Sequence, residues 1–135
     1  MNRYVLIICA FAAWGALAQA HAQAPVDAKT AFTERQADLV ALAGHLGALH
    51  RLRQLCAYTE NVDLFRNRMR ELVPLEAPMG RTRLDMIAAF NEQYRSQSTA
   101  HLTCSDEART TYETEAAAAL TVTNRLYAPF AQRAN

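Results

Sequence analysis

The chain has 135 residues and a formal net charge of +1, from 14 lysines and arginines set against 13 aspartates and glutamates. This length suits one domain, and the nearly neutral balance argues against non-specific nucleic-acid binding, which requires a strongly basic surface. We therefore expect one small domain that has no nucleic acid as a partner.

Residues 1–22 have the layout of a secretory signal peptide. Arg3 provides a positive start, an almost wholly apolar run extends from Tyr4 to Leu17, and small residues follow, so we expect cleavage near Ala20 or Ala22. The rival interpretation is an uncleaved anchor, but the run is shorter than the ~20 residues of a spanning helix. The pattern predicts a periplasmic protein that is not stably inserted in a membrane after cleavage.

The remainder of the chain has a helical pattern. Residues 23–29 contain Pro25 and predict a disordered lead before a helical domain over residues 30–130. Helical spacing of apolar residues predicts helices over 30–57, 63–73 and 82–102, and a fourth that follows Cys104. Pro74 is expected to kink or end the second helix and Pro129 to stop the fourth. Short loops between four helices predict an all-α fold, a small up-down four-helix bundle.

The first helix carries the most informative pattern. Residues three and four apart form one face, which consists of Leu39, Leu42, Leu46, Leu49, Arg53 and Cys56. Gly44 and Gly47 lie within this helix, where each costs roughly 1 kcal/mol relative to alanine. Two such costs predict that another backbone approaches closely at these positions.

Two cysteines remain after the leader, which takes Cys9 with it. Cys56 and Cys104 form the simplest pair in an oxidising compartment, so we predict one disulfide between them. In an up-down bundle the first and third helices end at the same pole. Cys56 lies at the first of these ends and Cys104 just beyond the second, in agreement with the predicted topology.

Two other uses of the cysteines are less consistent with export. The spacing of His101 and Cys104, completed by Cys56 and His50, resembles a zinc ligand set. Cys56 beside His101 resembles a nucleophile and its base. Because a disulfide consumes both thiols, we expect no metal site, no cofactor and no catalytic residue.

Five polar residues form the remaining candidate site: Arg53, Glu76, Asn91, Tyr94 and Arg95. Arg53 falls on the apolar face of the first helix, where a charge needs a partner, and Glu76 is a candidate partner. Asn91, Tyr94 and Arg95 share one side of the third helix. Two interpretations stay open: an internal network that sets helix register, and a pocket for a small anionic ligand.

Several segments resemble a known family. These are LGALHRLRQLC (46–56), FRNRM (65–69), LEAP (75–78), RLDMIAAFNEQYRS (83–96) and the isolated Cys104. Together they resemble DUF2385, an uncharacterised family of alphaproteobacterial secreted proteins. The resemblance implies export, a periplasmic location and a helical fold, and it implies no established activity.

These features together predict a non-enzymatic binding or structural protein of the cell envelope. Its partner is expected to be an envelope protein or another envelope component. The alternative is a small anionic-ligand binder that uses Arg53 and Arg95.

Overall fold

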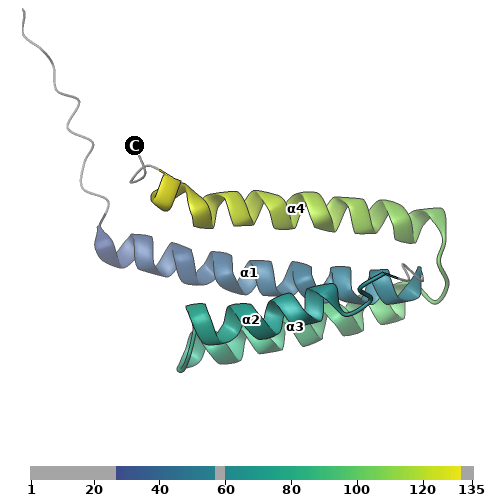
Figure 1. Ribbon diagram of the computed structural model, residues 1–135, viewed down its shortest axis with the longest axis horizontal. Helices are drawn as coiled ribbons and strands as arrows, with labels where there is room; N and C mark the ends of the chain where they lie inside the picture. The colour runs from purple at the N-terminus through teal and green to yellow at the C-terminus, as the bar shows by residue number, and fades with distance from the viewer. Residues whose placement is uncertain (1–26, 57–59, 132–135) are drawn as a thin grey trace, which may run out of the picture.

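The computed structural model describes residues 27–56 and 60–131, and this part of the chain is all-helical (Figure 1). The four helices are α1 (Ala28–Leu55), α2 (Leu64–Glu76), α3 (Arg81–Ala100) and α4 (Asp106–Ala131). They run up, down, up and down, which confirms the predicted bundle topology. The predicted leader, with its cleavage site, lies outside the described residues.

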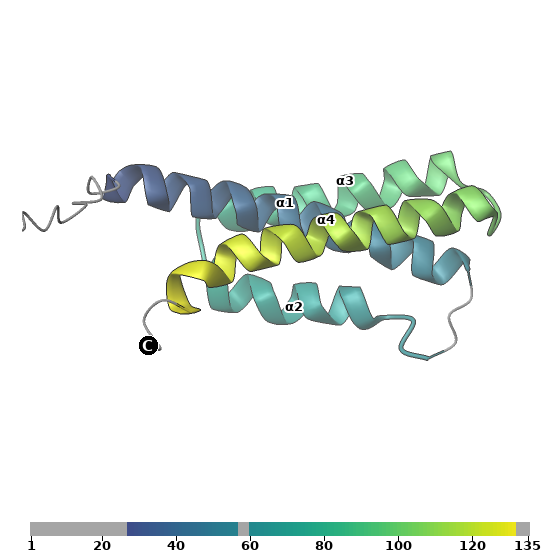
Figure 2. The same ribbon diagram turned by 90° about the horizontal axis from the view of Figure 1, so that it is seen from above.

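Helix α1 is the centre of the bundle. The other three helices pack on α1, α3 most extensively and α2 least, whereas their own backbones approach one another closely at hardly any point in the described residues. Figure 2 shows α1 and α4 lying between α3 on one side and α2 on the other. The arrangement therefore differs from a bundle with four equivalent sides.

The burial pattern of α1 follows from this central position. Its buried residues include the consecutive run Leu46, Gly47, Ala48, Leu49 and His50, so that no single stripe describes it. A helix that is surrounded by others is expected to be buried on several sides. The core is completed by Met69 and Val73 of α2, Met86 of α3, and Ala119 and Val122 of α4.

At Gly47 the backbone of α1 approaches the backbone of α3 very closely. A Cβ atom at this position would overlap the backbone carbonyl group of Phe90, whereas one at Gly44 would lie 3.4 Å from Cγ of Gln93. The predicted close backbone contact is confirmed at Gly47, where only glycine leaves room. At Gly44 the neighbour is a side chain.

The disulfide between Cys56 and Cys104 is present, with the two Cα atoms 4.8 Å apart. It joins the end of α1 to the link between α3 and α4, at the pole predicted from the topology. The two cysteines are 48 positions apart. On the chain-entropy model, a disulfide that closes a loop of this length stabilises the folded protein by about 4 kcal/mol, because it constrains the unfolded chain.

Two prolines lie inside helices where we expected them to act as breakers. Helix α2 continues past Pro74 to Glu76, and α4 continues past Pro129 to Ala131. The prediction for Pro129 was therefore wrong, and Pro74 does not end α2. Each proline stands close to its helix end, where its missing N–H removes little of the ladder, and Ala77 N still donates to Val73 O at 2.9 Å.

The other helix ends differ from prediction by one or two residues. Helix α1 begins at Ala28, so it includes the last two residues of the predicted lead, and Asp27 caps it by accepting from Lys29 N. Ser105 accepts from Ala108 N at 3.2 Å and caps α4. No helix of the described residues is long and apolar enough to cross a membrane.

Candidate functional site

The five residues of the predicted polar cluster are distributed over three places. Arg53 is half-buried and donates to the backbone carbonyl groups of Glu60 and Asn61, at 3.0 Å for Asn61. Its guanidinium also lies over the ring of Phe65, 6.0 Å from the centroid. Arg53 therefore holds the segment that leads into α2.

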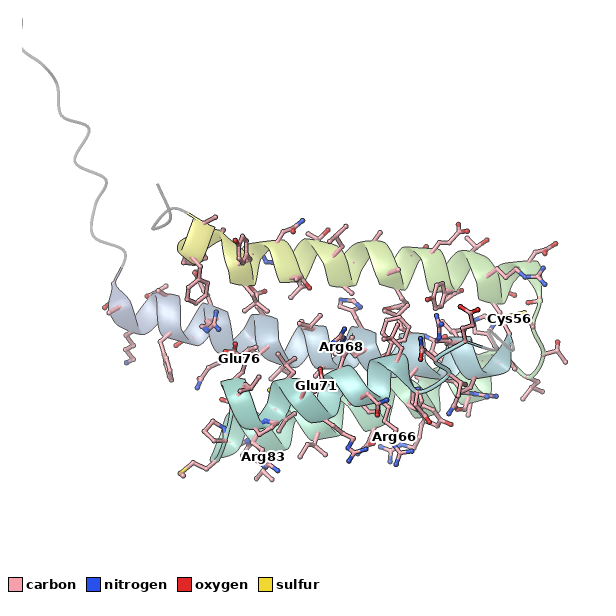
Figure 3. The ribbon with its side chains drawn as sticks, viewed as in Figure 1. Cys56, Arg66, Arg68, Glu71, Glu76 and Arg83 are labelled. Atoms are coloured by element: carbon pink, nitrogen blue, oxygen red, sulfur yellow. A yellow bond between two sulfur atoms is a disulfide. The ribbon has the colours of Figure 1, made fainter. Side chains whose placement is uncertain are left out.

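Glu76 lies at the other end of the bundle. Its carboxylate, at the end of α2 that Figure 3 labels, accepts a hydrogen bond from Arg35 near the start of α1. Arg53 stands near the end of α1, so the two residues belong to opposite poles. The expected contact of Glu76 with Arg53 is replaced by one with Arg35, because α2 runs antiparallel to α1.

Tyr94 takes part in a series of side-chain hydrogen bonds at the contact between α1 and α3. Its hydroxyl donates to Oε1 of Gln54 at 2.8 Å, and the amide nitrogen of Gln54 lies 3.3 Å from Nε2 of His50. His50 is buried and stacks near the rings of Phe90 and Tyr94. These hydrogen bonds join the partly buried side chains of Tyr94 and Gln54 to His50, and they help to fix the register of the two helices.

The environment of His50 favours the neutral imidazole. Burial lowers the pKa of His50 below its usual value, and the positive charge of Arg66 acts in the same direction. The nearby carboxylate of Asp63 opposes this shift. A neutral ring accepts the amide proton of Gln54, consistent with the observed geometry.

Asn91 lies on a different surface, the open groove between α2 and α3. This α2–α3 groove has a volume of about 300 Å³ and is lined by Met69, Arg70, Val73, Pro74, Arg83, Ile87, Phe90 and Asn91. Met69 and Val73 are buried core residues, and Phe90 packs against the same core. The floor of the groove is therefore the apolar core itself, and its polar lining consists of two arginines and an asparagine.

The groove exists because α2 and α3 diverge. They are consecutive antiparallel helices with a short link, Ala77 to Gly80, which normally places two helices side by side. Here each packs on α1 and their backbones stay apart. Gly80, with φ of +86°, precedes α3 and has the positive φ that glycine adopts without strain.

The carboxylates of α2 and α3 are directed away from the groove. Glu71 pairs with Arg68, Asp85 pairs with Arg81, and Glu76 pairs with Arg35. The fourth, Glu92, lines a different surface that α3 forms with α1 and α4. No carboxylate of these two helices therefore lines the groove.

Four arginines of the same helices make no ion pair with any described residue: Arg66, Arg70, Arg83 and Arg95. Arg66 and Arg70 are four residues apart and share one face of α2, while Arg68 lies on another. Figure 3 shows Arg66 and Arg83 along the edge away from α4, and Arg68 with Glu71 on the edge toward α1. The groove is therefore apolar at its floor and cationic at its sides.

The other chemistries considered for this sequence find no support in the described residues. Cys56 is bonded to Cys104, so its sulfur is not a free nucleophile. His101 is buried near the same pole. Among residues 27–56 and 60–131, no three histidine, cysteine or acidic side chains gather in a way that could hold a metal ion.

The family model that matches this chain covers residues 35–130 and is described as Protein of unknown function (DUF2385). The chain belongs to the DUF2385 family. The matched residues contain both cysteines and the whole lining of the groove. No curated protein and no solved structure matches the chain.

Sequence reasoning singled out Asn91 and Arg95, interpreted Arg70 as part of a solvated arginine run, and did not select Arg83. The sequence does contain a signal that separates paired from unpaired arginines. Arg68 and Arg81 each have a carboxylate three or four residues away on the same helix, with which they form an ion pair. Arg70 and Arg83 have no acidic residue at such a spacing. That these two arginines line the same groove depends on the divergence of α2 and α3.

Proposed function

We propose that this DUF2385 protein is exported to the periplasm and acts there as a non-enzymatic binding protein for an anionic component of the cell envelope. The leader-like pattern of residues 1–22 supports export. The bond between Cys56 and Cys104 also supports it, because structural disulfides persist in oxidising compartments.

The observation that carries the binding role is the unpaired cationic lining of the α2–α3 groove. Arg70, Arg83 and Asn91 are its polar side chains. A guanidinium stays protonated and an amide does not titrate, so neither serves as a nucleophile or a general base. Both groups donate hydrogen bonds to carboxylate, sulfonate or phosphate oxygens, which makes binding of an anion the chemistry that this lining favours.

The alternative prediction, a ligand site built on Arg53 and Arg95, is refined by the same geometry. Arg53 donates to backbone carbonyl groups and supports the fold. Arg95 follows Asn91 by four residues on α3, so it extends the face that lines the groove. The proposed anionic site therefore uses Arg70 and Arg83, with Arg95 as an outer charge.

A titration with anilinonaphthalene sulfonate tests this proposal, because the probe combines an apolar fluorophore with one sulfonate. The oxidised protein without its leader should bind the probe saturably at one site. The double variant Arg70→Gln/Arg83→Gln should lose about tenfold in affinity, since removing a charge partner at the protein surface costs up to about 1 kcal/mol.

Arg109→Gln is the matched control, since Arg109 is an exposed arginine of α4 that pairs with Asp106. It should leave binding of the probe unchanged, and circular dichroism should show that all variants remain folded. Probe binding that is absent, or equal in the double variant and the control, would overturn the proposed site. Recovery of leader-containing protein with free thiols from cell envelopes would overturn the proposed export.

A further inference from the structure

We propose that the α2–α3 groove binds a single-chain anionic amphiphile, an acyl or alkyl chain that carries one carboxylate or phosphate. This inference rests on the proposed function and names the class of ligand. The chain would lie along Met69, Val73 and Ile87, and the headgroup would meet Arg70 or Arg83 at the side of the groove.

The floor of the groove fits an aliphatic chain. Met69 and Val73 are 6% and 5% exposed, while Ile87 remains 39% exposed at the groove although its neighbours belong to the core. Covering such water-exposed apolar surface with an aliphatic chain is favourable, because it removes the surface from water. Of the five apolar lining residues, four are aliphatic, and Phe90 alone is aromatic.

The volume sets a limit on the length of the chain. The groove holds about 300 Å³, the lower end of the range for small-molecule sites. A group of the size of a water molecule occupies about 30 Å³, so the groove accommodates roughly ten methylene-sized groups. A single chain of medium length fits this space, whereas a two-chain lipid does not.

The charges select the headgroup. The acidic residues of α2 and α3 pair elsewhere or line another surface, so no carboxylate competes for Arg70 and Arg83. Arg66 and Arg95 lie about one helical turn beyond the lining and add positive potential at the same edge. An anionic group is therefore attracted, and a cationic group of equal length is repelled.

Competition against the fluorescent sulfonate tests the inference with four ligands that share one chain. Dodecanoate, dodecyl phosphate, dodecyl maltoside and dodecyl trimethylammonium are each titrated below their critical micelle concentrations. The two anionic ligands should displace the probe at concentrations at least tenfold lower than the neutral and cationic ones. Comparison of dodecanoate with dodecyl phosphate distinguishes a fatty-acid source from a phosphate-bearing lipid.

Chain length and two variants sharpen the test. Affinity should rise about twofold to fourfold for each added methylene up to about ten carbons, and should then level off when the groove is full. Ile87→Gln should weaken dodecanoate more than it weakens octanoate. Arg83→Gln should weaken the anionic ligands about fivefold and leave dodecyl maltoside unchanged.

Equal displacement by all four headgroups, or an affinity that does not depend on chain length, would overturn the inference. The proposed function has a separate outcome. If the fluorescent sulfonate binds in an arginine-dependent manner while no alkyl anion displaces it, the groove stands as an anion site and the acyl class is wrong. If the sulfonate itself does not bind, the proposed function fails first.

Discussion

The two sides of α3 differ sharply in how they pack. On one side α3 meets α1 so closely that Gly47 has no room for a Cβ atom beside Phe90. On the other side α3 diverges from α2 and leaves an open groove of about 300 Å³. The helix that is farther away in sequence is therefore the closer one in space.

The difference shows how a central helix changes a four-helix bundle. In up-down topology α1 and α3 run parallel, and in a square bundle they would face each other across a diagonal. Because α1 occupies the centre here, it becomes the immediate neighbour of α3, and α2 is displaced to another side of α1. The tight contact and the open groove therefore have one cause, which substitutions on each side of α3 can test.

The largest effect is expected from Gly47→Ala. The added methyl group would overlap the backbone of Phe90, which cannot rotate away as a side chain can. We expect a loss of about 3 kcal/mol or more in the free energy of unfolding, at the upper end of overpacking costs. Urea denaturation of the oxidised protein measures this loss.

Gly44→Ala is the matched control on the same helix. Its Cβ atom would lie 3.4 Å from Cγ of Gln93, at the flexible part of a side chain. The helix gains up to about 1 kcal/mol from alanine, so the net change should be within about 1 kcal/mol of zero. Equal destabilisation by the two variants would contradict a specific backbone contact at Gly47.

Much of this architecture could be predicted from the sequence. Helical periodicity located all four helices to within a few residues, and the two cysteines were consistent with the topology because a disulfide requires neighbouring helix ends. The central role of α1 could not be predicted from its apolar face. A run such as Leu46 to His50 is buried on several sides only because three other helices surround it.

A smaller loss of stability is expected from substitution of Arg53. Comparing this loss with that for Arg83 distinguishes an arginine that supports the fold from one that is available for binding. Arg53→Ala removes hydrogen bonds to the carbonyl groups of Glu60 and Asn61, so we expect a loss of about 1–2 kcal/mol in unfolding free energy. Arg83→Ala should change stability by less than about 0.5 kcal/mol, because Arg83 makes no ion pair with a described residue.

Urea denaturation of both variants under identical conditions provides the comparison. The reverse ranking, with Arg83 more important for stability than Arg53, would mean that the groove arginines serve the fold. It would also remove the charge argument on which the anionic ligand depends.

Less of the candidate site than of the fold could be predicted from the sequence. Helical spacing predicted that Asn91, Tyr94 and Arg95 share one side of α3, but Tyr94 contacts Gln54 of α1 whereas Asn91 lines the groove. The link between Arg53 and Glu76 required knowledge of which poles the two residues occupy. The location of Arg70 and Arg83 beside one apolar floor depends on the divergence of their helices, which helical spacing does not predict.

The smallest expected effect is a pH dependence of the unfolding free energy that arises from His50, at the tight contact of α1 with α3. Burial lowers the pKa of His50 from its usual value of 6.5. Between the lowered pKa of the folded state and the usual pKa, the unfolded chain binds a proton that the native protein does not. The free energy of unfolding should therefore fall as the pH decreases through about 6.5 and level off, for this group, below the folded-state pKa.

Urea denaturation between about pH 7.5 and about pH 5.5 measures this dependence. His50→Gln should reduce the loss of stability toward low pH, whatever its effect at neutral pH. His45→Gln, which removes a histidine paired with Glu115 between α1 and α4, should retain the loss. If the unfolding free energies of the two variants depend equally on pH, His50 does not remain neutral at the α1–α3 contact.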